Sequence, residues 1–169
     1  MGRQNSVELQ GPAADEVWPL LADFCNFHKW FPILDTCYQV EGVPGQPGVI
    51  RYASLYPDAF GKTSLSADDH GHHDDQRSIK WVTEKLLAID PIERCLSYEI
   101  VDNNIGFKSY VGTMQVLSVN DRDCASVRST GHLFVIRLKG GDLKTFYFLC
   151  GSTLQSMAKK IEHVLSSTA

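Results

Sequence analysis

The chain has 169 residues, 43% of them hydrophobic and 21% charged, and its formal net charge is −4. This length and composition fit one globular domain, residues 1–169, that can bury a substantial core. Lysine and arginine form no basic stripe, so nucleic acid is not an expected partner. No apolar run approaches the roughly 18 residues that span a bilayer, and the N-terminus lacks an apolar signal core, so we expect a cytoplasmic protein without a membrane span.

The five cysteines predict neither a disulfide framework nor a zinc ribbon. Their number is odd, their spacing is wide and no Cys-x-x-Cys pair occurs. We therefore expect reduced and mostly buried thiols at these positions: Cys25, Cys37, Cys95, Cys124 and Cys150.

The first part of the chain predicts a strand followed by two helices. Alternating apolar residues around Val7 indicate a short strand. In the next segment Asp15 and Glu16 precede an apolar stripe at helical spacing, and carboxylates in a first turn complement the helix dipole. A second, short helix is expected between Asn26, which can cap it, and Pro32, which ends it.

The rest of the chain predicts six strands and one long helix. After Asp142, apolar residues recur every three or four positions, which indicates an amphipathic helix of roughly 24 residues. We therefore expect an α+β fold, in which a curved antiparallel sheet of about seven strands wraps around the C-terminal helix and leaves a space beside it. The six strands are expected at 37–42, 48–56, 78–89, 94–101, 106–118 and 124–137.

Four polar residues occupy strand positions where alternation would place apolar ones. Each shares its face with apolar neighbours, so we expect all four side chains to point inward: Arg51, Glu84, Tyr98 and Tyr110. An unpaired buried charge costs several kcal/mol, so an inward arginine and glutamate should contact each other, a ligand or trapped water. The pattern predicts a polar-lined cavity. Two other interpretations stay open, namely a stabilising ion pair in an ordinary core and a register slip that leaves both charges outside.

One segment, residues 67–76, is rich in histidine and aspartate. Imidazole and carboxylate could together hold a divalent ion, but a flexible insertion over residues 57–77 without a metal explains the composition more simply. The chain also has no Gly-rich phosphate loop after a strand, no His-Glu-x-x-His and no Gly-x-Ser-x-Gly. We therefore expect no metal and no cofactor.

Several stretches resemble the plant lachrymatory-factor-synthase-like proteins, which belong to the polyketide cyclase/dehydrase and lipid transport superfamily. The resemblance is good between residues 17 and 117, and it extends to the final helix by type only. The matching stretches are residues 18–32, 40–42, 48–52, 84–90, 97–98 and 110–115. It implies the START-like helix-grip fold of the major birch pollen allergen. It also implies that the functional arginine, acid and two cavity tyrosines of the family correspond to Arg51, Glu84, Tyr98 and Tyr110.

In the onion enzyme of this group, a small sulfenic acid is isomerised by an intramolecular proton transfer. The present chain departs from that pattern in two places. It has extra residues between Arg51 and Glu84, and residues 127–130 lack the tryptophan that usually faces the ligand. These departures predict a different gate and room for a larger or differently shaped ligand.

The expected function is general acid–base catalysis, without a cofactor, on a small and partly apolar metabolite. Glu84 would give and take the proton, Arg51 would offer its guanidinium to an oxyanion, and Tyr98 and Tyr110 would orient the ligand. The alternative is a carrier or receptor for a small hydrophobic ligand or lipid, in which the same residues only bind. A third possibility, a partner-recruiting module, has only the length of the 57–77 insertion in its favour.

Overall fold

Seven antiparallel strands form one sheet in the computed structural model, which describes residues 2–56, 79–119, 124–135 and 143–168. The strand order is β1-β7-β6-β5-β4-β3-β2, so that every neighbour after the first pair is also a neighbour along the chain. The strands are β1 (Gly2–Glu8), β2 (Leu34–Glu41), β3 (Ile50–Leu55), β4 (Lys80–Asp90), β5 (Cys95–Asn103), β6 (Phe107–Val119) and β7 (Cys124–Val135). Because β1 pairs with β7, the two ends of the sheet are β1 and β2.

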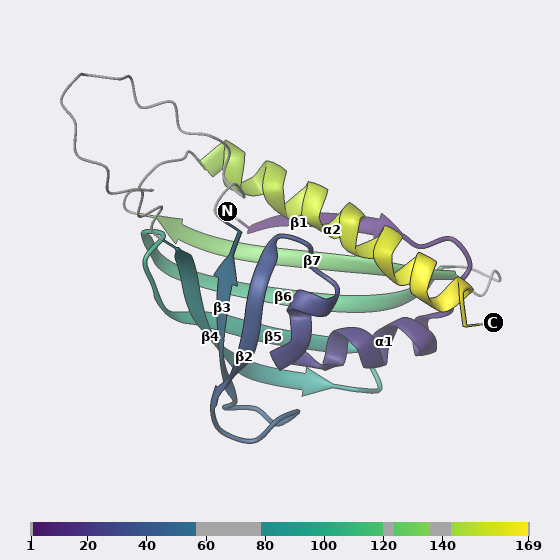
Figure 1. Cartoon of the computed structure of the whole chain (residues 1–169), viewed down its shortest axis with the longest axis horizontal. Coiled ribbons are helices and arrows are strands. Elements are labelled where there is room, and N and C mark those ends of the chain that lie inside the picture. The colour runs from purple at the N-terminus through teal and green to yellow at the C-terminus, as the bar shows by residue number, and fades with distance from the viewer. Residues whose placement is uncertain (1, 57–78, 120–123, 136–142, 169) are drawn as a thin grey trace.

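The helices of the described residues lie on one side of this curved sheet (Figure 1). They are α1 (Ala14–Ala22), the 3₁₀ helix η1 (Phe24–Lys29) and the long α2 (Leu143–Ser166). In α2, Leu154, Met157 and Ile161 are almost fully buried, at the helical spacing that the sequence predicts. They belong to the same core as the inward residues of the strands. The expected α+β helix-grip fold is therefore confirmed.

Some elements begin earlier than the sequence predicts. The first strand already starts at Gly2, since the polar residues before Val7 pair with β7. The second strand starts at Leu34 instead of residue 37. Asn26 does not cap the short helix: it lies inside η1 with a non-helical backbone conformation, and its side-chain amide donates to the carboxylate of Asp23. The carboxylates in the first turn of α1 are as predicted.

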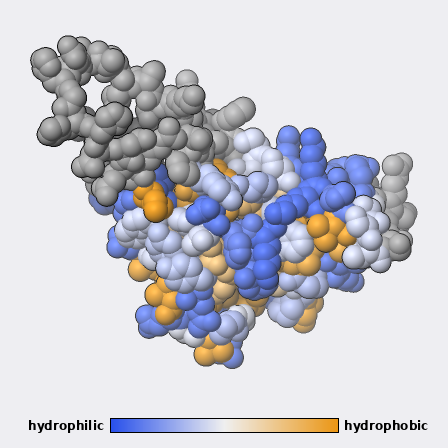
Figure 2. Space-filling model, in the orientation of Figure 1, coloured by the Kyte–Doolittle hydropathy of each residue, from blue (hydrophilic) through white to orange (hydrophobic). Residues whose placement is uncertain are grey.

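The polar and apolar residues separate between surface and interior. Figure 2 shows a mainly hydrophilic surface on the helix side, where apolar side chains occur in small separate groups. Isolated exposed apolar residues such as Ile92 and Val43 lie in turns at the strand ends. The predicted insertion 57–77, with its histidine- and aspartate-rich segment, and the end of the last strand at 136–137 lie outside the described residues.

Candidate ligand-binding pocket

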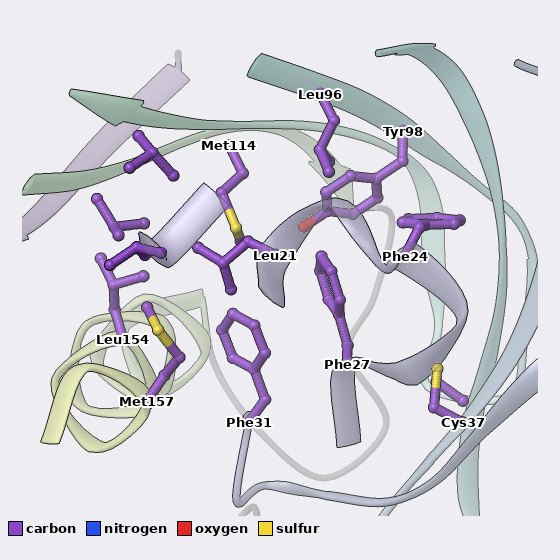
Figure 3. Packing of buried hydrophobic residues seen from close by; sticks show 14 of the residues in the cluster. Leu21, Phe24, Phe27, Phe31, Cys37, Leu96, Tyr98, Met114, Leu154 and Met157 are labelled. Atoms are coloured by element: carbon purple, nitrogen blue, oxygen red, sulfur yellow. The ribbon is translucent and has the colours of Figure 1, made fainter. Parts of the chain in front are cut away.

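A pocket of about 160 Å³ lies between the sheet, η1 and α2. Most of its walls are apolar, and Figure 3 shows how Phe27 and Phe31 approach it from one side and Leu154 from α2. The four residues that strand alternation turned inward all line it. The described lining residues are Phe27, Phe31, Ile33, Leu34, Arg51, Ala53, Leu55, Val82, Glu84, Tyr98, Ile100, Ile105, Phe107, Tyr110, Met114, Thr153 and Leu154.

Arg51 and Glu84 form a buried ion pair in the wall of this pocket. The two residues are direct cross-strand partners in β3 and β4, which places their side chains on the same face and within reach of each other. Two nitrogens of Arg51, Nε and Nη2, lie 2.8 and 2.6 Å from the same oxygen, Oε2 of Glu84. Arg51 is only 3% exposed and Glu84 only 8%. The inward orientation thus agrees with the alternation, and no register slip moves these two charges outside.

The guanidinium of Arg51 is enclosed by residues of η1. Its Nη1 donates to the backbone carbonyl of Phe24. Its central carbon lies 3.8 Å from the ring centre of Phe24 and 4.0 Å from that of Phe27, within the range of cation–π attraction. Burial acts to lower the pKa of Arg51, but the charge of Glu84 and its hydrogen bond are among the influences that raise it above its ordinary value. The guanidinium is therefore a permanent positive charge held in one place.

The two carboxylate oxygens of Glu84 differ in their hydrogen-bond partners. Both contacts from Arg51 end on Oε2, and no described residue donates a hydrogen bond to Oε1. The side chain of Glu84 remains 10% exposed, against 3% for Arg51, and it lines the pocket. A carboxylate oxygen without a donor in mostly apolar surroundings is a strong hydrogen-bond acceptor and can accept a proton.

The two phenols, Tyr98 of β5 and Tyr110 of β6, lie next to each other, with 6.1 Å between ring centres. Tyr98 also contacts Phe24 and lies 5.4 Å from the carbon of the Arg51 guanidinium, as measured to the ring centre. Figure 3 shows the ring of Tyr98 beside Phe24 and Phe27. Gly112 makes this arrangement possible, because it is the register partner of Tyr98 and has no side chain in the space of the ring.

The turn between β5 and β6 is held rigidly at the rim of the pocket. The side-chain oxygen of Asn103 accepts hydrogen bonds from the backbone N–H groups of Ile105, Gly106 and Phe107, at 2.9 to 3.1 Å. Its amide donates to the carbonyl of Phe107 at 3.0 Å. Asn104 ties the same turn to β4, since it accepts from the N–H of Trp81. These bonds fix the positions of Ile105 and Phe107, which both line the pocket.

Sequence reasoning found the polar residues of the pocket and missed most of its other walls. Phe27 and Thr153 lie in helices that the sequence predicts, but a helical pattern does not say which element a side chain faces. Phe24 gave no signal for its carbonyl contact with Arg51, since that contact joins positions 27 residues apart. Gly112 interrupts an alternating strand, and a glycine inside a strand often marks a close approach of another group.

Two further features concern metals and membranes. In the part of the chain that the structure describes, no group of three or more histidine, cysteine, aspartate or glutamate side chains is placed to hold a metal ion. The described helices also include none that is long and apolar enough to cross a bilayer.

The sequence matches the model of a known family, described as polyketide cyclase / dehydrase and lipid transport, over residues 4–147. The chain belongs to this family. Solved structures with low sequence identity to this chain have a similar fold. The ginseng major latex-like protein 151 from Panax ginseng is 16% identical, with a TM-score of 0.65 over 96% of this chain and 95% of that one.

Two bacterial proteins show the same likeness to this member of the polyketide cyclase/dehydrase and lipid transport family. A protein from Nitrosospira multiformis is 18% identical, with a TM-score of 0.67 over 95% of this chain and 96% of the other. An uncharacterised protein from Bacillus thuringiensis is 15% identical, with a TM-score of 0.67 over 95% and 98% of the two chains. At these identities the likeness is one of fold, and the function has to be argued from the pocket.

Proposed function

We propose that the protein binds a small, partly apolar metabolite in this pocket and isomerises or dehydrates it by general acid–base catalysis without a cofactor, as a lachrymatory-factor-synthase-like enzyme would. The observation that carries the proposal is the position of Glu84. Its carboxylate is buried in the wall of a mostly apolar pocket and is held by Arg51 through Oε2, while no described residue donates a hydrogen bond to Oε1.

The roles follow from this geometry. For an isomerisation, Oε1 of Glu84 takes the proton from a polar X–H group of the ligand, and the electron pair of that bond forms a double bond to the adjacent carbon. The electrons of the ligand's original carbon–carbon double bond then take the proton back from Glu84, so that no atom is gained or lost. Arg51 fixes the carboxylate, and the phenols of Tyr98 and Tyr110 stabilise charge that develops on X.

The alternative is a carrier that holds the same ligand without converting it. Two observations favour the carrier function. The walls of the pocket are mostly apolar, and the family description includes lipid transport as well as cyclase and dehydrase activities. In this alternative Glu84 and Arg51 would only bind, and the ligand would leave unchanged.

Glu84→Gln separates the two functions, because glutamine keeps the size of the side chain and its ability to accept a hydrogen bond but cannot shuttle a proton. The ligand is first identified by native mass spectrometry of the protein purified from its natural source. Wild type and variant are then compared for affinity and for conversion of that ligand. An enzyme should keep most of its affinity and lose roughly 10²–10⁴-fold in rate.

Glu93→Gln provides the matched control, since Glu93 is exposed in the turn between β4 and β5 and does not line the pocket. It should change neither affinity nor rate. If the wild type returns the ligand unchanged under every condition in which it binds, the enzyme is excluded and the carrier stands.

A further inference from the structure

The pocket contains a positive charge that is largely committed to the protein itself. An arginine side chain has five N–H donors. All three guanidinium nitrogens of Arg51 contact protein oxygens. Nε and Nη2 contact Oε2 of Glu84, and Nη1 contacts the backbone carbonyl of Phe24. The rings of Phe24 and Phe27 lie within 4.0 Å of the guanidinium carbon. Arg51 therefore offers an incoming anion little free surface, and its planar fork is already engaged by a carboxylate.

The negative charge of the pair is more accessible than the positive one. Glu84 lines the pocket with a side chain that is 10% exposed, compared with 3% for Arg51, and its Oε1 has no described donor. Among the described lining residues, Arg51 is also the one cationic side chain. An anionic ligand would thus bring a second negative charge close to Glu84 in a space of low polarity, where repulsion is strong. A ligand with a donor would instead complete the hydrogen bonding of Oε1.

From this asymmetry we propose that the ligand is a neutral molecule that donates a hydrogen bond from a hydroxyl, thiol or similar X–H group, and that the pocket discriminates against carboxylates and other anions. The proposal rests on the proposed function insofar as the pocket is taken to be a ligand site. It differs from the expectation drawn from the sequence, in which Arg51 would receive an oxyanion. The pocket walls add a size requirement to this charge requirement.

The volume indicates how large the neutral ligand is. A cavity of about 150 Å³ lined by apolar side chains accepts benzene. The present pocket of about 160 Å³ is of the same size, so the part of the ligand held inside has the dimensions of a single six-membered ring with a small substituent. Benzyl alcohol, toluene and benzoate match this size and differ in the property of interest, because they are a neutral donor, a neutral molecule without a donor and an anion.

The experiment measures binding of these three probes to the wild-type protein by isothermal titration calorimetry at neutral pH. We expect the affinity to fall in the order benzyl alcohol, toluene, benzoate, with benzyl alcohol bound at least tenfold more tightly than benzoate. Benzoate bound as tightly as benzyl alcohol, or more tightly, overturns the proposed ligand class and leaves the pocket as a binding site. If no probe binds to the folded protein, the ligand-binding function fails, and the ligand class fails with it.

Glu84→Gln tests the physical cause of the preference. Removing the carboxylate charge leaves the positive charge of Arg51 uncompensated, so the variant should bind benzoate at least tenfold better relative to benzyl alcohol than the wild type does. Glu93→Gln makes the same chemical change on the surface and should leave the ratio as in the wild type. An unchanged ratio in Glu84→Gln, with both variants folded at the temperature of the titration, contradicts the role of Glu84 in selecting a neutral ligand. The comparison of the three probes on the wild type stands without the variant.

Discussion

Gly112 and Tyr98 face each other across β6 and β5, and the phenol ring of Tyr98 occupies the space where a side chain at position 112 would begin. A Cβ atom at Gly112 would lie 2.7 Å from the ring carbon Cζ of Tyr98, 2.9 Å from its hydroxyl and 3.0 Å from a ring carbon of Tyr110. Such distances are far below van der Waals contact. The absence of a side chain at one strand position therefore sets the position of both phenols in the pocket.

The first prediction concerns Gly112→Ala. The added methyl group must displace the two phenol rings, and overpacking of this kind costs about 1–3 kcal/mol of folding free energy. We also expect weaker binding of any pocket ligand, since both displaced phenols line the pocket. Denaturant unfolding and titration with benzyl alcohol measure the two effects.

Gly151→Ala is the matched control for this substitution. Its added methyl group would lie 3.7 Å from the side-chain oxygen of Asn5, an ordinary contact, and the position is inside α2. In a helix the change should stabilise the protein, by about 0.5–1 kcal/mol. Equal effects of the two alanines on stability would show that the approach of Tyr98 to Gly112 has no energetic weight.

The second prediction concerns the ion pair and uses a double-mutant cycle. Arg51→Met leaves the carboxylate of Glu84 buried without its partner, and Glu84→Leu does the reverse, so each single change should cost about 3–5 kcal/mol. The double variant should lose far less than the sum, because no charge remains unpaired in it. Urea unfolding of the four proteins gives the coupling energy. Strictly additive losses would mean that the two charges do not stabilise each other.

The third prediction concerns the turn between β5 and β6. Asn103→Ala removes the oxygen that accepts three backbone N–H groups, and the loss should be about 1–3 kcal/mol. Hydrogen exchange at the amides of Ile105, Gly106 and Phe107 should become faster. Asn103→Asp keeps the accepting oxygen and removes only the donor to Phe107, so it should protect these amides nearly as well as the wild type. Fast exchange in both variants would assign the rigidity to the backbone alone.

The fourth prediction concerns stability at high pH. Burial raises the pKa of the Cys37 thiol above its ordinary value, although the nearby guanidinium of Arg51 acts in the opposite direction. The unfolded chain therefore loses this proton at lower pH than the folded protein does. The contribution of the Cys37 thiol to the free energy of unfolding is complete below the pKa that this thiol has in the unfolded chain. It is lost as pH rises through the pKa in the folded protein, so stability should fall above about pH 8.5.

Cys25 and Cys95 add to this trend in the same direction, since burial raises the pKa of both thiols. Denaturant unfolding under reducing conditions, between about pH 7 and about pH 10, measures the fall. In Cys37→Ala the fall should be smaller than in the wild type. A variant that loses stability just as steeply would show that Cys37 is not one of the groups responsible.

Strand alternation was sufficient to orient the four polar residues of the pocket, because side chains on a strand alternate strictly between two faces. Arg51 and Glu84 were each turned inward by their own apolar neighbours, and their pairing then followed from the register of β3 with β4. The roles of these residues in catalysis remain part of the proposal. Alternation does not depend on the rest of the fold, which is why this part of the site could be predicted.

Contacts between distant segments could not be predicted in the same way. The enclosure of Arg51 by Phe24 and Phe27 depends on how η1 packs against the sheet, and no local pattern encodes that packing. The start of β1 at Gly2 could not be predicted for a similar reason. The polar residues at its beginning have little intrinsic preference for a strand, and they adopt the strand conformation because they pair with β7. The family resemblance predicts the overall fold, but it does not predict these contacts.

Ala53 is a small residue in the wall of the pocket, almost completely buried and directly opposite Val82 on the neighbouring strand. A larger apolar side chain there would fill part of the space and add contacts with the surrounding rings, the kind of change that commonly raises the stability of natural proteins. The same side chain would take the volume that a ligand needs. Selection for a compact core and selection for ligand binding therefore act in opposite directions at this position. If alanine persists in a variant library selected for binding, but not in one selected for heat resistance, ligand binding is the reason for alanine at position 53.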